Sequence, residues 1–414
     1  MDRFTRYLAG LLGTVLIGGL AVAGACLLVD PYRMLALIEI PGFNQRKPQA
    51  GLQIRLNKAY DARRAAPDAI ILGNSRVEAG IDPEHPALIE AGLRPFNLGI
   101  PGAGMFEQFR YLQHAIHGQR LRLLIVGLDF VDFLARPDAR SPFEQPVREF
   151  EGRLVVDRNG APNRTRGRAL AGDFNVAFFS LNSVADSVLT VLGQGIEAGH
   201  RTPLGFNPLD EYHRLVRLEG HFSLFEQRDR ENLQQRMAGP RTTRDPRGGL
   251  GFSYEILRRM MDIARAEGAE VIMFIHPYHA RILEIFRIAG LWSAFESWKR
   301  DVTKLVQESS SGDWRKKPEL WDFSGYTTWT MEPVPKRGDV TTQMKWYWEA
   351  GHYKAELGRQ LLDRMLISGH EDVRGVRLRP ENVEVRISSI RAARVDYLSD
   401  FSADVNVLER YLID

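Results

Sequence analysis

The amino terminus carries an uncharged run that constrains the topology of the whole chain. From Tyr7 to Val29, about 23 residues include no charged side chain, and a helix needs about 20 apolar residues to cross a bilayer core. Arg3 and Arg6 precede the run, and Asp30 follows it. Because positive charge stays on the cytoplasmic side, we predict a single inner-membrane span with the bulk of the chain periplasmic or otherwise extracytoplasmic.

Two cleaved leaders compete with this interpretation. A signal peptide would have a shorter apolar region, of about 7 to 15 residues, although Ala23-Gly24-Ala25 offers small residues before a cut. Lipoprotein cleavage before Cys26 is the other alternative, but the apolar run continues through Val29. The length of the run favours an uncleaved anchor. Cys26 is the single cysteine, so no intramolecular disulfide can form.

Composition excludes two broad classes of protein. The 55 Lys and Arg residues nearly balance the 52 Asp and Glu residues, leaving a formal net charge of +3, so we expect no nucleic-acid partner. The 44% hydrophobic and 26% charged residues are typical of a globular protein and exclude general disorder. We divide the chain into a membrane anchor (1–30), a stalk and entry helix (31–66), a core in two parts (67–131 and 251–367), an insertion or cap (132–250) and a C-terminal tail (368–414).

Short apolar runs alternate with amphipathic stretches after residue 66. This pattern is typical of a parallel sheet covered by helices, so the predicted fold class is α/β: one N-terminal transmembrane helix followed by a doubly wound parallel-sheet domain. The expected strands are 69–72, 95–99, 121–127, 270–275 and 320–323, and the expected helices are 105–117, 254–267 and 353–366.

The third strand and the next core helix are separated by about 120 residues, too many for an ordinary connection. We expect an apolar helix at 174–192 between Arg-rich loops around 140–168 and 228–247, in an insertion that either covers one end of the sheet or shapes a substrate groove. Arg236, Arg241, Arg244 and Arg247 fit an anionic glycan or a solvated loop. We expect this insertion to bind substrate and to supply no catalytic group. In the tail, the alternation at 383–387 fits an edge strand or hairpin.

The candidate chemistry begins at Gly73-Asn74-Ser75-Arg76, where the first strand ends. A serine on a strand-to-helix turn presents its hydroxyl at the carboxyl edge of the sheet, near backbone N–H groups that can stabilise an oxyanion. The alternative is that Ser75 simply caps the helix. Far along the chain, Glu349 precedes His352 by three residues, a spacing that lets the carboxylate orient the imidazole toward a serine. Asp322, at the end of the fifth strand, is a rival partner for His352.

Two further side chains follow the fourth strand. His276 and Tyr278 are expected to line the same carboxyl edge and to meet substrate. His276 and His279 could suggest a metal site, but no third spaced ligand accompanies them. We therefore expect no metal and no cofactor.

These motifs resemble the blocks of the SGNH (GDSL-like) hydrolase superfamily. Gly73-Asn74-Ser75 stands for the first block, with the nucleophilic serine, and Glu349-Ala350-Gly351-His352 for the last, with Glu in place of the usual Asp. The stretch 97–102 resembles the second block, whose glycine gives a backbone N–H to the oxyanion. The resemblance assigns that role to Gly99 or Gly102.

The third block departs from the family pattern. Gly127-Leu128-Asp129 stands where the family has Gly-x-Asn, whose asparagine side chain contributes to the oxyanion site. An ionised Asp129 only accepts hydrogen bonds. Either backbone donors bind the oxyanion, or Asp129 has another role, such as binding a sugar hydroxyl.

The layout also resembles membrane-anchored SGNH-like acyltransferases of cell-envelope polysaccharide modification, such as alginate O-acetyltransferases and the lipoteichoic acid D-alanyl-transfer protein. This resemblance implies an O-acetyltransferase or esterase acting on a polysaccharide or acylated sugar, beside a membrane-bound O-acyltransferase. Ser75 would be the nucleophile, His352 the base, and Glu349 or Asp322 the orienting acid. The alternative is a catalytically impaired glycan-binding or assembly subunit.

Overall fold

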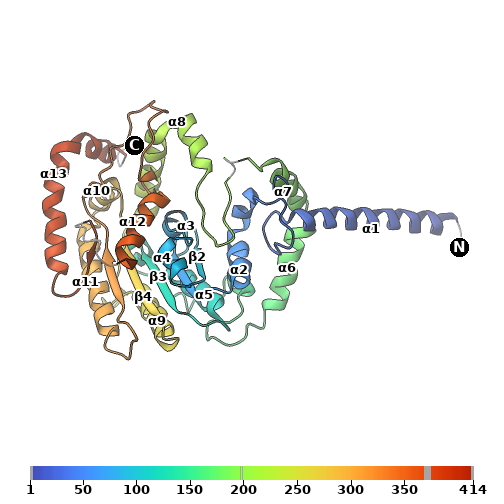
Figure 1. Ribbon diagram of the computed structural model, residues 1–414, viewed down its shortest axis with the longest axis horizontal. Helices are drawn as coiled ribbons and strands as arrows, with labels where there is room; N and C mark the ends of the chain where they lie inside the picture. The colour runs from blue at the N-terminus through green and yellow to red at the C-terminus, as the bar shows by residue number, and fades with distance from the viewer. Residues whose placement is uncertain (1–2, 196, 198, 368–373, 412–414) are drawn as a thin grey trace.

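A mixed α/β body and one projecting helix make up the computed structural model, which describes residues 3–195, 197, 199–367 and 374–411 (Figure 1). The strands are β1 (Ala69–Gly73), β2 (Pro95–Gly99), β3 (Leu123–Leu128), β4 (Glu270–Ile275), β5 (Glu319–Asp322), β6 (Tyr347–Glu349), β7 (His352–Tyr353) and β8 (Val376–Arg377). The α-helices are α1 (Arg3–Val29), α2 (Ile54–Ala65), α3 (Ser75–Gly80), α4 (Pro86–Glu90), α5 (Met105–Ile116), α6 (Arg166–Phe178), α7 (Leu181–Leu192), α8 (Glu211–Glu231), α9 (Phe252–Ala266), α10 (Ala280–Ile288), α11 (Trp292–Ser309), α12 (Ala355–Leu366) and α13 (Val383–Arg410). Short helical turns are η1 (Pro48–Gln53), η2 (Phe130–Phe133), η3 (Glu149–Arg153) and η4 (Asn232–Arg236).

The central sheet has the strand order β2-β1-β3-β4-β5-β8, with β1 to β5 parallel and β8 antiparallel to β5. All five predicted strands are confirmed, within one to two residues at each end. Their apolar runs are buried almost throughout, as expected for a parallel sheet covered on both faces. Gly73 and Gly99 pair at the carboxyl ends of β1 and β2, so the turns after these strands share one edge of the sheet.

The helices form two groups around this sheet. Helix α5 contacts α2 and α9, and α9 contacts α11, whereas α3 contacts α12. The chain moves one way from β1 to β2 and the opposite way from β2 to β3. Because such crossovers are right-handed, α3 and α5 lie on opposite faces of the sheet.

The segment between β3 and α9 contains the loops expected at about 134–148, 154–165 and 237–251, but it holds three helices, α6, α7 and α8, where one apolar helix was expected. The predicted helix 174–192 is two helices, α6 and α7, bent by 55° relative to each other. The Ser180 hydroxyl starts the second helix by accepting the Ser183 N–H at 3.0 Å. Arg228, expected in a loop, lies in the last turn of α8.

The prediction of an edge strand at 383–387 is wrong, because this stretch begins helix α13. Val383, Ile387 and Ile390 are buried, whereas Val385 is 70% exposed. The spacing of the buried residues is that of a helix face, so packing against α10 and α11 overrides the local alternation. The start of the predicted tail, residues 368–373, lies outside the described residues.

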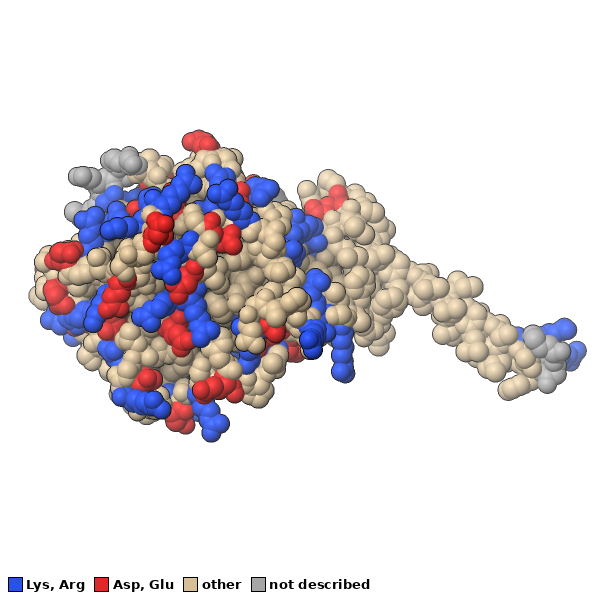
Figure 2. All heavy atoms as spheres, turned by 90° about the horizontal axis from the view of Figure 1, so that it is seen from below, with Lys and Arg blue, Asp and Glu red and all other residues tan. Residues whose placement is uncertain are grey.

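Charged side chains of both signs are interspersed over the body, in keeping with the small net charge (Figure 2). Helix α1 projects from one end of the body and is long and apolar enough to cross a membrane. On the face shown, the base of this helix carries few charges.

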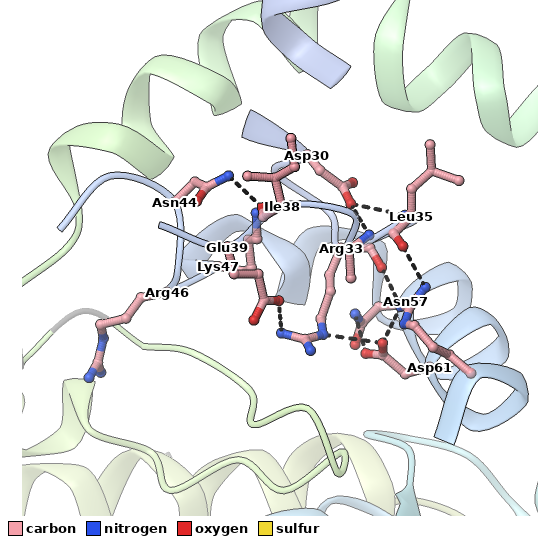
Figure 3. A network of polar contacts seen from close by, with 12 residues as sticks. Asp30, Arg33, Leu35, Ile38, Glu39, Asn44, Arg46, Lys47, Asn57 and Asp61 are labelled. Atoms are coloured by element: carbon pink, nitrogen blue, oxygen red, sulfur yellow. Dashed lines mark hydrogen bonds and ion pairs between the residues drawn. The ribbon is translucent and has the colours of Figure 1, made fainter. Parts of the chain in front are cut away.

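The interpretation of residues 31–66 as a stalk and entry helix is wrong for the stalk, because its first part is folded against the body (Figure 3). The Asp30 carboxylate accepts the N–H groups of residues 34, 35 and 36 at 2.7–2.9 Å. The Asn44 amide donates to the Leu28 carbonyl at 2.8 Å, and the Lys47 ammonium donates to the Val29 carbonyl. These contacts satisfy carbonyls of the last turn of α1 and tie the end of the helix to the segment that follows it.

Candidate active site

Ser75 is the first residue of α3, directly after β1. Gly73 is needed at the turn because a Cβ there would lie 2.3 Å from Val77. The cap of the helix is Asn74, whose Oδ1 accepts the Arg76 N–H at 3.0 Å, so the interpretation of Ser75 as the helix cap is wrong. Within the described part of the chain, neither the hydroxyl nor the N–H of Ser75 makes a hydrogen bond. Ser75 is half-buried, and both groups remain available to a ligand.

His352 and Glu349 face each other across the two-stranded sheet β6–β7. The Glu349 Oε1 is hydrogen-bonded to the His352 Nδ1, and its Oε2 accepts the Gly351 N–H at 2.5 Å. The turn between the strands therefore fixes both oxygens of the carboxylate. With Nδ1 engaged, the imidazole keeps Nε2 for another partner, as a general base requires.

Arg228 of α8 completes the surroundings of this carboxylate. Its Nε lies 3.2 Å from the Glu349 Oε2. Burial alone would raise the pKa of Glu349, but the charges of His352 and Arg228 lower it to about 2. Glu349 is thus an ionised, buried carboxylate held by three partners. Arg228 comes from the segment expected to supply substrate binding only, so that segment also positions the candidate acid.

Close packing joins the far end of helix α3, at Gly80, to strand β7 and helix α12. Helix α3 contacts both β7 and α12. A Cβ at Gly80 would lie 2.0 Å from the Tyr353 ring, and one at Gly358 would lie 1.6 Å from the Gly80 carbonyl. The helix that begins with Ser75 therefore rests directly on the strand that carries His352. No Ser75–His352 hydrogen bond is present among the described residues, and this bond is often loose without substrate.

Asp129, predicted to face an oxyanion or a sugar, is instead almost fully buried. Its carboxylate forms an ion pair with Arg76 and accepts hydrogen bonds from the Asn74 amide at 2.7 Å and the Tyr278 hydroxyl at 3.0 Å. Burial would raise the pKa of Asp129, but the charge of Arg76 holds it below its usual value. The carboxylate is the centre of a network beneath Ser75, and substrate contact is not its role.

His276 and Tyr278 belong to the same buried layer and do not line an open edge as predicted. Both are almost without solvent exposure. The His276 Nδ1 lies 3.2 Å from the Tyr353 hydroxyl, and burial lowers the pKa of His276 to about 3. His279 bonds the Glu332 carbonyl at 2.9 Å. Among the described residues no group of three His, Cys, Asp or Glu side chains could hold a metal ion.

The two candidate oxyanion glycines differ. The Gly99 N–H donates to the Asn97 side chain at 2.8 Å, and a Cβ at Gly99 would lie 2.5 Å from the Glu78 nitrogen. Its N–H is therefore already used. Gly102 is exposed, has a φ of +71°, and makes no N–H hydrogen bond within the described ranges. Of the two, only Gly102 can offer a donor.

Asp322 is not a partner of His352. It is fully buried and pairs with the Lys299 ammonium at 2.7 Å and the Arg386 guanidinium at 3.1 Å. These charges outweigh the effect of burial and lower the pKa of Asp322 to about 2. The rival acid joins α11 and α13 to the end of β5, which leaves Glu349 as the acid of the site.

The basic cluster that fits an anionic glycan or a solvated loop is partly engaged with the rest of the protein. Arg244 lies 2.6 Å from Asp301 of α11. Arg247 is exposed, and Arg241 is half-buried. The side chain of Arg236 lies outside the described residues.

Sequence reasoning missed two arginines of the site. Arg76 follows Ser75 directly and is buried, and Arg228 contacts Glu349 from a helix more than a hundred residues earlier. Arg76 lies in the same Asn-Ser-Arg turn as the candidate nucleophile, so its place beside Ser75 was the signal that could have identified it. Nothing local marks Arg228.

Together these residues define an α/β protein with a serine at the carboxyl end of strand β1 and a histidine paired with an ionised glutamate on the separate sheet β6–β7, which contacts helix α3. Comparison of the chain with protein-family models and with curated proteins gave no match.

Proposed function

We propose that this protein is a membrane-anchored, SGNH-like serine acyl-transfer enzyme, an O-acetyltransferase or esterase, acting outside the cytoplasm on a polysaccharide or acylated sugar. One observation carries the proposal. The ionised Glu349 holds His352 on strand β7, and β7 packs against the helix that begins with the unengaged Ser75.

The reaction divides into two balanced steps. Ser75 Oγ attacks the acyl carbonyl while His352 Nε2 takes the hydroxyl proton and then returns it to the departing alcohol. In the second step, water or a sugar hydroxyl gives its proton to His352 and attacks the acyl-serine, and His352 returns that proton to the departing Ser75 Oγ. The N–H groups of Ser75 and Gly102 are the donors available to the oxyanion, since Asp129 is engaged with Arg76.

Acylation of Ser75 tests this proposal directly. Incubation with p-nitrophenyl acetate or a fluorophosphonate should add one acyl or phosphonyl group, read by intact-mass spectrometry. The variants Ser75→Ala and His352→Ala should each abolish the adduct, because nucleophile and base act as one unit. Ser389→Ala, at an exposed serine of α13, is the matched control and should leave the adduct intact.

The same assay identifies the orienting acid. Glu349→Gln should slow acylation by about 10²–10⁴-fold, because the amide no longer stabilises the imidazolium. Asp322→Asn should acylate normally but unfold more readily, since Lys299 loses its buried partner. No adduct on the folded wild-type protein above the Ser75→Ala background would reject catalysis in favour of a glycan-binding subunit.

A further inference from the structure

Helix α7 has its apolar side on the outside. Ser183, Ser187 and Thr190 are buried against the rest of the protein, whereas Leu181 is 89% exposed and Leu192 is 77% exposed. A helix on the surface of a water-soluble domain shows the opposite pattern, with its apolar stripe facing the core. Small residues buried between helices and large apolar residues facing outward are typical of helices that contact lipid.

The buried side of α7 packs on the last turns of α1. Both helices are in contact, and the Ser183 hydroxyl lies 3.8 Å from the Cys26 sulfur. The single acidic residue of α7, Asp186, accepts a hydrogen bond from the Tyr32 hydroxyl at 2.5 Å. Its charge is therefore partnered on the protein side, which leaves the outer side of the helix free of acidic and basic groups.

Two other segments beside the end of α1 also expose apolar side chains. An exposed stretch follows α1, with Leu37, Ile38 and Ile40, and the end of α6 adds Phe174 and Phe179. An apolar groove of about 330 Å³ opens between α1 and α7, with Val22, Val188 and Leu192 among its walls. We call the exposed apolar side chains of α1, α6 and α7, together with Leu37, Ile38 and Ile40, the basal apolar surface.

The length of α1 places this surface at the edge of a bilayer. A helix rises about 1.5 Å per residue, so a hydrocarbon core of about 30 Å takes about 20 residues. Counted from Tyr7, the first residue after Arg6, these end at Cys26. Cys26 is the residue on which α7 packs. Helices α6 and α7 also run across the base of α1, as helices lying in a membrane surface do (Figure 1).

We propose that the basal apolar surface is embedded in the lipid of the bilayer that α1 spans, with α7 at the boundary between headgroups and acyl chains. The occupant of the groove is then a lipid acyl chain. The hydrogen bonds of the junction after α1 would then hold the body close above the membrane. This inference shares the membrane span with the proposed function but does not depend on catalysis.

Lipid quenching in nanodiscs tests this inference on the full chain. Leu181→Cys and Leu192→Cys, each in a Cys26→Ala background, would carry a bimane label in phosphatidylcholine nanodiscs with or without 5-doxyl lipid. The control is Val395→Cys, an apolar residue 68% exposed on α13, the helix at the end of the molecule opposite α1 (Figure 1). The Cys26→Ala protein without an added cysteine should take up no bimane, which checks that labelling is selective. Retained Ser75 acylation in each variant checks that it is folded.

We expect 5-doxyl lipid to remove most of the fluorescence at Leu181 and Leu192 and little at Val395. Aqueous iodide should instead quench the label at Val395 strongly and the labels at Leu181 and Leu192 weakly. Iodide quenching at Leu192 equal to that at Val395 would overturn the inference, because the surface would then face water. Protection from both quenchers would also overturn it, since a second copy of the chain would then cover the surface. Loss of Ser75 acylation in the wild-type protein with lipid quenching retained would reject the proposed function alone.

Discussion

At the scale of single residues, the contact between Asp129 and Arg76 decides what the third motif does. Arg76 must turn inward beside the candidate nucleophile, and a buried guanidinium needs an ionised partner. Asp129 supplies that charge and also accepts the Asn74 amide and the Tyr278 hydroxyl. The acid at this position therefore supports the turn that presents Ser75, in place of a donor to the oxyanion.

Asp129→Asn separates these two roles. If the position faced the oxyanion, an asparagine amide would speed acylation of Ser75. The structure predicts the opposite: Arg76 loses its buried partner, the free energy of unfolding falls by about 3–5 kcal/mol, and acylation does not improve. Urea denaturation and the p-nitrophenyl acetate assay measure both, with Asp138→Asn at an exposed position as the control. Faster acylation with unchanged stability would assign Asp129 to the oxyanion.

At the scale of elements, the junction after α1 holds an unfavourable backbone in place. Asp30, Arg33 and Ala36 have φ values of 46°, 56° and 48°, in the left-handed region that non-glycine residues rarely adopt. The Asp30 carboxylate binds three successive N–H groups of this turn, and Arg33 pairs with Asp61 of α2 at 3.2 Å. These polar contacts hold the strained turn against the body.

Asp30→Ala should release this junction without unfolding the sheet. Each N–H that loses its acceptor costs about 1–3 kcal/mol. Because three N–H groups lose theirs, local opening should become at least about tenfold faster. Limited trypsinolysis in nanodiscs should then cleave after Arg33 or Arg46, while Ser75 still acylates. Asp138→Ala should leave the cleavage pattern of the wild type. An unchanged rate of cleavage in Asp30→Ala would show that packing alone holds the segment.

At the scale of the whole molecule, buried neutral histidines make the fold sensitive to acid. Burial lowers the pKa of His114 to about 4 and those of His276 and His279 to about 3. In the unfolded chain each histidine titrates at about 6.5, so the unfolded state binds more protons below that pH. The three residues therefore contribute stability above about pH 6.5 that is lost as the pH falls toward 3 to 4.

The free energy of unfolding should fall with acidification below pH 6.5, by about 1.4 kcal/mol per pH unit for each of these histidines and about 4 for all three. Urea titrations between pH 7.5 and 5 measure this slope. His276→Asn should make the slope shallower by one proton, and His117→Asn, at an exposed position, should not change it. An identical slope in His276→Asn would mean that His276 is already protonated in the folded protein.

The sequence by itself determined the elements whose signal is local. Strands β1 to β5 are short apolar runs buried almost throughout, and α1 is an uncharged run long enough to span a bilayer. The Glu349–His352 contact was also predictable, because it joins residues three apart in one turn. In each case, neighbouring residues in the chain are neighbours in the structure.

Only the tertiary structure decided which distant groups meet. Asp129 pairs with Arg76 across 53 positions, Asp322 pairs with Lys299 across 23, and Glu349 meets Arg228 from α8. The polar segment after α1 and the alternating stretch of α13 were misjudged for the same reason. The same local sequence allows a polar side chain to be solvated or buried. In the same way, an apolar alternation can fit a strand or one side of a helix. The free energy that separates these outcomes comes from the buried partner, and the fold alone brings that partner into contact.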